Sequence, residues 1–383
     1  MIKTKIEKIR NLLTEGKSDG ILISSVANIV YLTGYSGFSI EEREAYLVVT
    51  KDSQYIITDG RYSETIKKEV KDFSLEIRSS KNSLEDIFKN IVRENQIKSL
   101  GVEEDDLRVK EYKALSKVFQ KLVGVSINPH RAIKTLEEIN FIEEACKLGD
   151  KTFSYILKKI KVGMSEKEVA WEMEQFIKSQ GATLSFPTIV AFSENSSVPH
   201  HQLGHKKMEE QNGQFILLDF GVKIENYCSD MTRTIFWGKT DAKKEKIYNT
   251  VKEAQEKAVE YINQQISHSV RNDKDSAQVD IKSNTPEVLL LAREVDKMAR
   301  DYIVSQGYAS IPHSLGHGIG LQVHEHPFLS SKSKETLEEG MVFSIEPGIY
   351  IEGFGGVRIE DLYVIEKNGL RQLTKSPKEL LIV

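Results

Sequence analysis

Four acidic residues and one histidine, each at or beside apolar, strand-like sequence, are the side chains of this chain that could carry chemistry. They are Asp219, Asp230, His317, Glu346 and Glu360. A single buried acid is energetically costly, and four that converge without a cation would repel one another and raise each other's pKa values. Divalent cations would neutralise such a cluster. The sequence therefore predicts a metal site built from these five side chains.

The types of donor atom limit which metal ions and which reaction are expected. Carboxylate oxygens with a single imidazole favour Mn2+, Co2+, Fe2+ or Zn2+ over a structural site built from thiolates. We expect two divalent ions, with Mn2+ preferred, because a pair of ions neutralises all four acids. Two adjacent ions can hold a bridging water, lower its pKa and polarise a scissile carbonyl. The expected chemistry is hydrolysis.

Each residue also has a plainer structural interpretation. Asp219 lies just before Gly221 and could be an ordinary turn residue, and Glu346 precedes a Pro-Gly pair that favours a turn. The glycines on both sides of His317 indicate a close backbone approach, but a glycine-rich loop without function has the same composition. The joint occurrence of all five residues favours the metal site.

Two domains are expected to position these residues, because 383 residues exceed what one hydrophobic core usually organises. Residues 1–130 alternate short apolar runs with helical patterns, which predicts an α/β domain. Its predicted strands lie near residues 20–24, 45–50, 55–58 and 99–102. Pro129 interrupts the pattern, so the boundary is placed between residues 130 and 131.

Residues 131–383 are expected to form an α+β domain that holds the whole candidate site. Two helices should open it, one from Thr135 and one from Ser165, each with a glutamate three residues on that favours a helix start. Sheet-like segments follow near residues 184–192, 214–222 and 226–237. A polar, aperiodic stretch at about 267–285 predicts an exposed inserted loop that leaves the chemistry intact.

Composition and charge exclude several other classes of protein. Lys and Arg number 53 against 57 acidic residues, a net charge of -4, so neither nucleic acid nor an anionic membrane is an expected partner. No apolar run reaches the roughly 18 residues that a membrane span requires, and the N-terminus has no continuous apolar segment of a signal peptide. Two cysteines in a chain this long indicate reduced thiols. We therefore expect a cytoplasmic protein.

The same residues carry a resemblance to a known family. The motifs are His313-x-x-x-His317-x-x-Gly320-x-x-x-His324, Glu346-Pro347-Gly348, Gly355-Gly356-Val357-Arg358-Ile359-Glu360-Asp361, Asp219-Phe220-Gly221 and Ser229-Asp230-Met231-Thr232-Arg233-Thr234. Together they resemble the pita-bread metallopeptidases, which include methionine aminopeptidase, Xaa-Pro aminopeptidase, prolidase and creatinase-like proteins. About the first 125 residues resemble the creatinase or prolidase N-terminal domain, notably at residues 28–34 and 58–62. The resemblance implies that α/β domain followed by an α+β pita-bread catalytic domain.

Carried over residue by residue, the resemblance implies a role for each metal ligand. Asp219 would chelate one ion, and His317 and Glu346 would bind the other. Asp230 and Glu360 would bridge the two ions. Glu346 would also act as the general base, because its carboxylate would lie beside the nucleophilic water.

The resemblance also implies roles for four residues around the metals. His200 would contact the substrate and stabilise the tetrahedral oxyanion. His313 and His324 would line the substrate pocket, with His324 polarising the peptide. Arg358 would orient this set by pairing with neighbouring acids or by holding His324. Structural hydrogen bonding is the alternative role for all four residues.

The resemblance to family members with this N-terminal domain implies a homodimer that is specialised for peptides with proline at the second position. Dipeptidases of this kind usually carry an Arg after a His-x-x-Pro segment, where it pairs with the free carboxylate of the substrate. Here the segment His324-Glu325-His326-Pro327-Phe328 has none, which favours an Xaa-Pro aminopeptidase. Prolidase, with Lys332 or Lys334 supplying the cation, is the close alternative. A catalytically silent binding protein and a metal-free creatinase-like amidinohydrolase are further alternatives.

Overall fold

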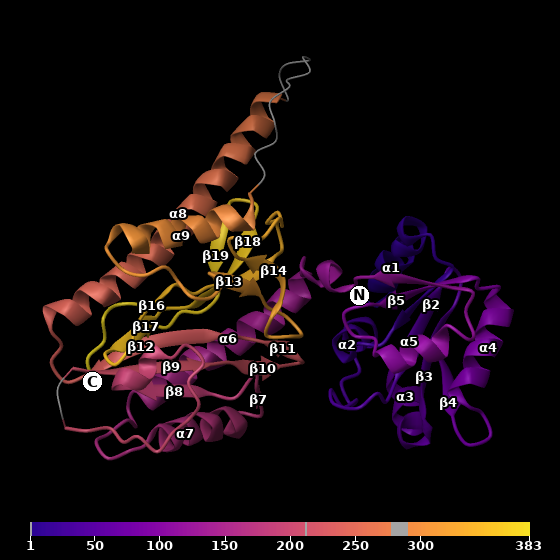
Figure 1. The fold of residues 1–383 in the computed structure, drawn as a ribbon, viewed down its shortest axis with the longest axis horizontal. Helices are drawn as coiled ribbons and strands as arrows, with labels where there is room; N and C mark the ends of the chain where they lie inside the picture. Colours follow the sequence, from indigo (N-terminus) through magenta and orange to yellow (C-terminus); the bar gives the residue numbers. More distant parts are fainter. Residues whose placement is uncertain (1, 211–212, 277–289) are drawn as a thin grey trace. The chain divides into compact units, whose positions relative to one another are not determined.

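The chain divides into two compact units, Met1–Arg131 and Ala132–Val383 (Figure 1). The computed structural model describes residues 2–210, 213–276 and 290–383. The division falls one residue after the boundary expected from Pro129. All five expected metal ligands belong to the second unit.

The first unit is built on a six-stranded sheet with the strand order β4-β3-β2-β1-β5-β6. β2 is antiparallel to both of its neighbours, and the other adjacent pairs are parallel. The strands are β1 (Gly20–Ile23), β2 (Tyr46–Thr50), β3 (Gln54–Asp59), β4 (Ser74–Arg78), β5 (Ser99–Glu103) and β6 (Lys121–Val125). The α-helices are α1 (Ile2–Gly16), α2 (Val26–Thr33), α3 (Ser63–Glu69), α4 (Leu84–Asn95) and α5 (Val109–Leu115), with short 3-10 turns at Gly60–Tyr62 and Asn128–Arg131. This is the expected α/β arrangement.

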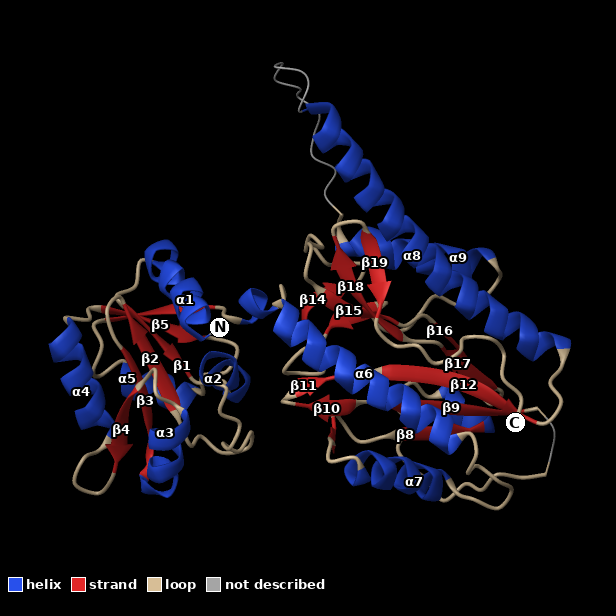
Figure 2. Cartoon of the chain, turned by 180° about the vertical axis from the view of Figure 1, so that it is seen from behind, coloured by secondary structure: helices blue, strands red, loops and turns tan. Residues whose placement is uncertain are grey.

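In the second unit, strands lie between two pairs of helices (Figure 2). The helices are α6 (Leu136–Ile156), α7 (Glu166–Ser179), α8 (Ala242–Ser276) and α9 (Ala292–Ser305). α6 and α7 share one apolar core with the three-stranded sheet β12-β9-β8, and α8 and α9 share another with the five-stranded sheet β14-β13-β15-β18-β19. The site must therefore be assembled where strands from both halves meet.

The strands of the second unit come in short antiparallel groups. The first group holds β7 (Thr183–Leu184), β8 (Ile189–Phe192), β9 (Gln214–Phe220), β10 (Val222–Ile224), β11 (Tyr227–Cys228) and β12 (Met231–Trp237), with a 3-10 turn at Ser193–Ser197. The second holds β13 (Gly316–Gly318), β14 (Glu325–Leu329), β15 (Val342–Ile345), β16 (Gly348–Ile351), β17 (Gly355–Arg358), β18 (Asp361–Glu366) and β19 (Gly369–Gln372).

The two helices that open this unit begin where their capping residues predict. Thr135 and Ser165 accept a hydrogen bond from the backbone N–H of Glu138 and Glu168, and each glutamate carboxylate accepts one from the backbone N–H of the capping residue. These reciprocal bonds satisfy two donors that a helix start would otherwise leave without partners.

Helix α8 corrects the expectation of a loop from residue 267, because it continues to Ser276. Polar, aperiodic sequence was interpreted as a loop, but extending an existing helix adds one backbone hydrogen bond per residue and needs no apolar face. Residues 277–285 of the predicted insertion lie outside the described residues. Within the described part of the chain, no helix is both long enough and apolar enough to span a bilayer.

Candidate active site

The five expected metal ligands stand on strands or directly beside strand ends. Asp219 lies in β9, opposite Thr232 of β12, and Asp230 comes just before β12. His317 is the middle residue of β13. Glu346 follows β15, and Glu360 lies between β17 and β18. Strands from both sheets therefore deliver these side chains to one place.

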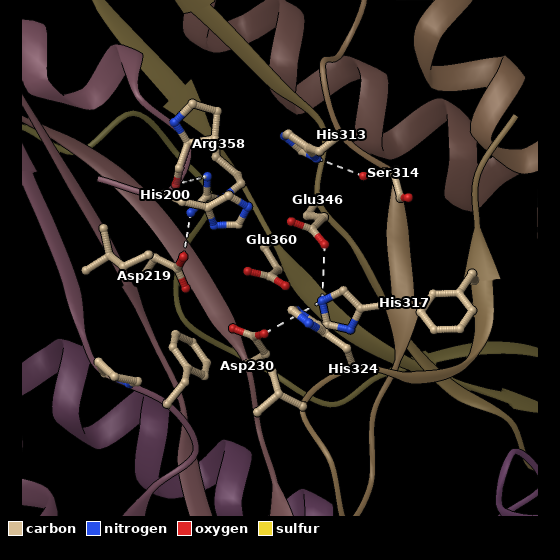
Figure 3. Close-up of a pocket in the computed structure, with 16 residues that line it drawn as sticks. His200, Asp219, Asp230, His313, Ser314, His317, His324, Glu346, Arg358 and Glu360 are labelled. Atoms are coloured by element: carbon tan, nitrogen blue, oxygen red, sulfur yellow. Dashed lines mark hydrogen bonds and ion pairs between the residues drawn. The ribbon is translucent and has the colours of Figure 1, made fainter. Parts of the chain in front are cut away.

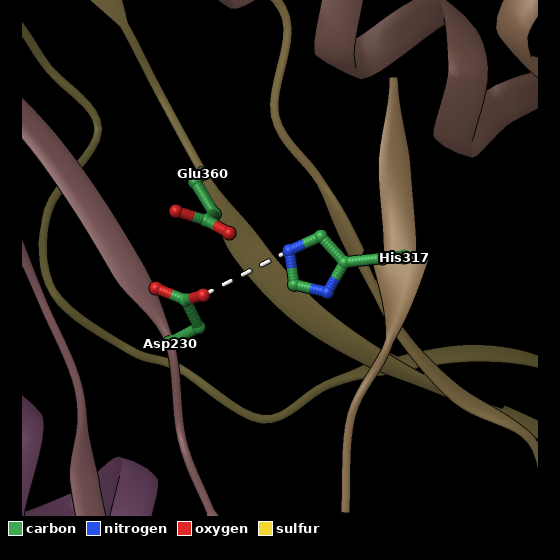
Figure 4. A group of neighbouring side chains, drawn as sticks. All are labelled: Asp230, His317 and Glu360. Atoms are coloured by element: carbon green, nitrogen blue, oxygen red, sulfur yellow. Dashed lines mark ion pairs between the residues drawn. The ribbon is translucent and has the colours of Figure 1, made fainter. Parts of the chain in front are cut away.

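Figure 4 shows that Asp230, His317 and Glu360 point toward one another. One ligand atom from each of them lies within 4.8 Å of the other two. The His317 Nε2 atom is 3.3 Å from Glu346 Oε1 and 3.8 Å from Asp230 Oδ2. These three residues, with Glu346, form a compact set of oxygen and imidazole donors.

The ring of His317 is oriented for ligation. Its Nδ1 atom lies 3.1 Å from the carbonyl oxygen of Gly318, which holds the proton on Nδ1. The Nε2 atom therefore faces the carboxylates, where a bound cation would take the place of its proton. A backbone carbonyl that fixes the tautomer in this way is a usual partner of a metal-binding histidine.

Burial and mutual repulsion shift the carboxyl pKa values. Burial raises the pKa of Asp230 well above its usual range, and the charges of Glu360 and Asp219 raise it further. Burial, with the charges of Glu346 and Asp219, raises the pKa of Glu360 to about 8. Burial also raises the pKa of Asp219, against the opposing charge of Arg358. These acids are too crowded to ionise together unless a cation lies among them.

Glu346 differs from the other acids because it faces His317. Burial alone would raise its pKa, but the hydrogen bond and charge of His317 outweigh burial and lower the pKa of Glu346 to about 2. The same contact raises the pKa of His317 to about 9, although burial opposes it. An ionised Glu346 is the form that a ligand or a general base needs.

Two buried oxygens in this cluster fit a divalent cation. Among the residues that the structure describes, none hydrogen bonds to Asp230 Oδ1 or Glu360 Oε1. The other oxygen of Glu360 accepts a bond of 2.7 Å from the Thr232 hydroxyl. Buried carboxylate oxygens normally have a partner, so these two atoms and the hard donor set are those of a divalent metal site.

Arg358 pairs with Asp219, one of the neighbouring acids expected as its partner, and among the described residues no hydrogen bond joins it to His324. Its Nη2 atom donates to Asp219 Oδ2 at 2.5 Å. Its other nitrogens donate to the Thr232 hydroxyl at 3.0 Å, the Pro199 carbonyl at 3.2 Å and the Tyr350 hydroxyl at 3.0 Å. All three guanidinium nitrogens are thus engaged.

The nine expected site residues line a single cavity of about 610 Å³ (Figure 3). They are His200, Asp219, Asp230, His313, His317, His324, Glu346, Arg358 and Glu360. The remaining wall is mainly apolar, with Phe186, Pro187, Ile189, Pro199, Ser314, Val323 and Phe328. A cavity with an apolar wall and a few convergent polar groups has the size and character of a small-ligand site.

The outer histidines are held in different ways. His313 Nε2 lies 2.9 Å from the Tyr350 hydroxyl, and its Nδ1 lies 2.8 Å from the Ser314 carbonyl. The ring of His324 packs edge-on against His317, with 4.2 Å between ring centroids. Burial lowers the pKa of both His313 and His324. Both rings are therefore neutral hydrogen-bonding groups at neutral pH.

A buried ion pair lies beside His324. Lys134 Nζ is 3.0 Å from Glu325 Oε1, and both side chains are 2% exposed. Glu325 directly follows His324 and also accepts a bond of 3.4 Å from the Gln322 backbone. This pair therefore ties the loop that carries His324 to the start of the second unit.

Sequence reasoning missed Tyr350 and Thr232. Tyr350 bridges His313 and Arg358, and Thr232 bridges Arg358 and Glu360. Tyr350 occurs in the apolar strand β16, four residues after Glu346, and Thr232 occurs two residues after Asp230. Their nearness to the ligands along the sequence was the available signal.

The fold and the site together define a metal-dependent peptidase, and the chain belongs to metallopeptidase family M24. The model of that family matches residues 140–272 and 281–367, and the model of the creatinase/prolidase N-terminal domain matches residues 5–133. Residues 273–280, which the family model leaves unmatched, lie inside the predicted insertion at about 267–285. A member of this family uses divalent metal ions, and Asp230, His317 and Glu360 form a candidate site for one.

Three relatives show the likeness over whole chains. A peptidase of Bacillus subtilis named YqhT is 40% identical over 99% of this chain and 100% of its own length. A solved Xaa-Pro dipeptidase from Bacillus anthracis is 36% identical with a TM-score of 0.87, covering 100% of both chains. A solved X-Pro aminopeptidase from Thermotoga maritima is 30% identical with a TM-score of 0.82, covering 99% of this chain and 100% of that one. The predicted family and fold class are confirmed.

Proposed function

We propose that this peptidase hydrolyses the bond between an N-terminal residue and proline in small peptides. The observation that carries the proposal is the convergence of four acids and His317 at one cavity, together with three further histidines and Arg358. Full-length relatives named for the Xaa-Pro bond support this substrate class.

We assign the metal ligands as Asp219, Asp230, His317, Glu346 and Glu360, holding two divalent ions. Asp219 would bind one ion, His317 and Glu346 the other, and Asp230 and Glu360 both. Hard oxygen donors with one imidazole favour Mn2+, and Co2+, Zn2+ or Fe2+ also suit this set. When bound, such ions supply an activated water and a Lewis acid for the scissile carbonyl.

The residues of the chain perform the remaining tasks. Glu346 accepts a proton from the attacking water and delivers it to the leaving proline nitrogen. His200 donates a hydrogen bond to the oxyanion. The neutral rings of His313 and His324 orient the peptide from the other side of the cavity. Arg358 fixes the Asp219 carboxylate and, through Tyr350, the ring of His313.

The aminopeptidase is the favoured activity, because the described residues of this cavity include no free Lys or Arg for a substrate carboxylate. Among the described residues that line it, Arg358 is the one Lys or Arg, and its nitrogens are already engaged. Neither Lys332 nor Lys334 lines the cavity. A dipeptide ending in proline would therefore bury its carboxylate without a cationic partner here, whereas a longer peptide extends that end away.

The second candidate is an Xaa-Pro dipeptidase, which the relatives named Xaa-Pro dipeptidase favour. Metal-stripped protein should be assayed on Ala-Pro, Ala-Pro-Ala and Ala-Ala-Ala, with and without Mn2+. Mn2+-dependent cleavage of Ala-Pro-Ala after the first residue, with little turnover of Ala-Pro, is the expected result. Turnover of Ala-Pro alone would establish the dipeptidase.

A lack of turnover on all three peptides, with each of Mn2+, Co2+ and Zn2+, would contradict the proposal that this chain is an Xaa-Pro peptidase of either kind. Asp230→Asn supplies the matched control, since it removes a ligand and should abolish turnover without removing the fold. A variant with full activity would show that Asp230 is not a ligand.

Two further attributes belong to the proposal. We infer a cytoplasmic location, which is supported by two buried cysteines without a disulfide, Cys146 and Cys228. We also infer that its binding partners are small peptides and not nucleic acid or a membrane. A homodimer is expected from the family resemblance. Light scattering after gel filtration would give a mass near twice the 43.5 kDa of the chain.

A further inference from the structure

Glu166 is a fully buried acid that lies outside the cavity. It is the first residue of α7, and its side chain is 0% exposed. A buried carboxylate is unstable unless donors surround it. Glu166 has four such donors, and all of them come from the segment that carries His200.

The four donors lie on both sides of His200 along the chain. Glu166 Oε1 accepts from the Phe192 backbone at 2.9 Å and from the Asn195 side chain at 2.7 Å. Glu166 Oε2 accepts from the Gly204 backbone at 3.0 Å and lies 3.0 Å from His201 Nε2. One carboxylate thus closes the base of a loop that runs from the end of β8 through the short 3-10 turn to Gly204.

His200 stands at the tip of this loop. The backbone of His201 donates to the carbonyl of Val198 at 3.2 Å, which makes a turn around Pro199 and His200. Among the described residues, none hydrogen bonds to the His200 ring. The ring is exposed to the cavity, so its position depends on the backbone of the loop.

We propose that Glu166 is a positioning residue for His200, acting through His201 and the backbone of residues 192–204. The proposal rests on the proposed function, in which His200 contacts the substrate. The two oxygens of a carboxylate offer acceptors, which is what four donors require. In Glu166→Gln, an NH2 group would replace one of the two oxygens. This group is itself a donor, so two of the four donors would lose their acceptor and face it. The loop would then shift, and His200 would move with it.

The test compares Glu166→Gln with Glu168→Gln, an exposed acid in the first turn of the same helix. Glu166→Gln should lower kcat/KM for Ala-Pro-Ala by roughly 10- to 100-fold, mainly through kcat, because a displaced catalytic group costs about that much. Its bound metal content should stay at the wild-type level. Glu168→Gln should keep the wild-type kcat/KM.

A double-mutant cycle separates positioning from a general structural role. If Glu166 acts through His200, adding Glu166→Gln to His200→Ala should cause no further loss of kcat. Losses that multiply would overturn the proposal. Should Glu166→Gln not fold, His201→Gln replaces it in the cycle. This variant removes one of the four donors from a partly exposed position and should show the same non-additivity with a smaller effect.

A readout that needs no catalysis is the reactivity of the imidazoles toward diethyl pyrocarbonate, followed by peptide mass spectrometry. In the wild type, the bond to Glu166 should protect His201, whereas His200 should react. Glu166→Gln should expose His201 to modification, and Glu168→Gln should not. An unchanged pattern in Glu166→Gln would overturn the proposal. A wild type that cleaves no Xaa-Pro peptide but shows this pattern would refute the proposed function and leave the anchoring role of Glu166 supported.

Discussion

Replacing Lys134 with Met should be among the most destabilising single changes in the second unit. The Lys134–Glu325 pair has a nitrogen-to-oxygen distance of 3.0 Å, and both side chains are 2% exposed. Removing one partner of a buried pair leaves the other charge buried without its counter-ion, which costs about 3–5 kcal/mol. The expected loss is therefore in that range.

A second variant isolates the charge effect from the loss of packing. Lys134→Met combined with Glu325→Leu removes both charges and keeps a similar side-chain volume. Replacing both members of a buried pair by apolar groups is often close to neutral. The double variant should therefore recover most of the stability that the single variant loses.

Urea unfolding followed by tryptophan fluorescence measures this effect in the second unit alone. The two tryptophans of the chain, Trp171 in α7 and Trp237 in β12, both belong to that unit. With an m value on the order of 3 kcal/mol/M, the single variant should unfold at a urea concentration about 1–2 M lower than the wild type.

Two results would refute the reasoning on this pair. One is a midpoint for Lys134→Met within ~0.3 M of the wild type, which would mean that water or another group compensates Glu325. The other is a double variant no more stable than the single one, which would assign the loss to packing. Glu168→Gln serves as the control with an exposed acid.

Three further outcomes are expected. Gly221→Ala should cost about 1–3 kcal/mol and weaken metal binding, measured by thermal melts under Mn2+ titration, because its Cβ would lie 2.1 Å from the Ser229 carbonyl oxygen. Removal of bound metal by a chelator should lower the melting temperature, and Mn2+ at 100 times its Kd should restore about 2.7 kcal/mol of folding stability. A melting temperature that does not change with Mn2+ would contradict the metal site. Arg233→Met should cost about 3 kcal/mol in the same urea assay, because it removes a 2.6 Å partner of the fully buried Asp361 and leaves the Lys378 contact at 3.2 Å.

The sequence predicted best what depends on local signals. The capping residues Thr135 and Ser165 marked the starts of α6 and α7, because a cap needs only residues three positions apart. The acids at strand ends pointed to one site, because burying them apart from a cation would be costly. The structure brings all nine residues to one cavity, and their individual roles stay predictions.

Contacts between distant segments could not be predicted in this way. The outer strands β4 and β6 of the first sheet are not among the predicted strands. Both are only partly buried, and β4 alternates apolar with polar residues, whereas β6 contains Leu122, Val123 and Val125 and could have been predicted. The choice of Asp219 over His324 as the partner of Arg358 depends on how β17 lies against β9 and β12. The bridging role of Tyr350 likewise depends on the register between β16 and β17.

The placement of the proposed metal ligands on strands from both halves of the second unit links the formation of the candidate site to the completion of folding. Thr232 and Glu360, bonded at the centre of the cluster, are 128 residues apart. Contacts of such long sequence separation form late, after the entropy of closing the intervening chain has been overcome. A nascent or partly unfolded chain therefore cannot assemble a functional acid cluster. The architecture itself therefore delays any hydrolysis at this site until the second unit has reached its final shape.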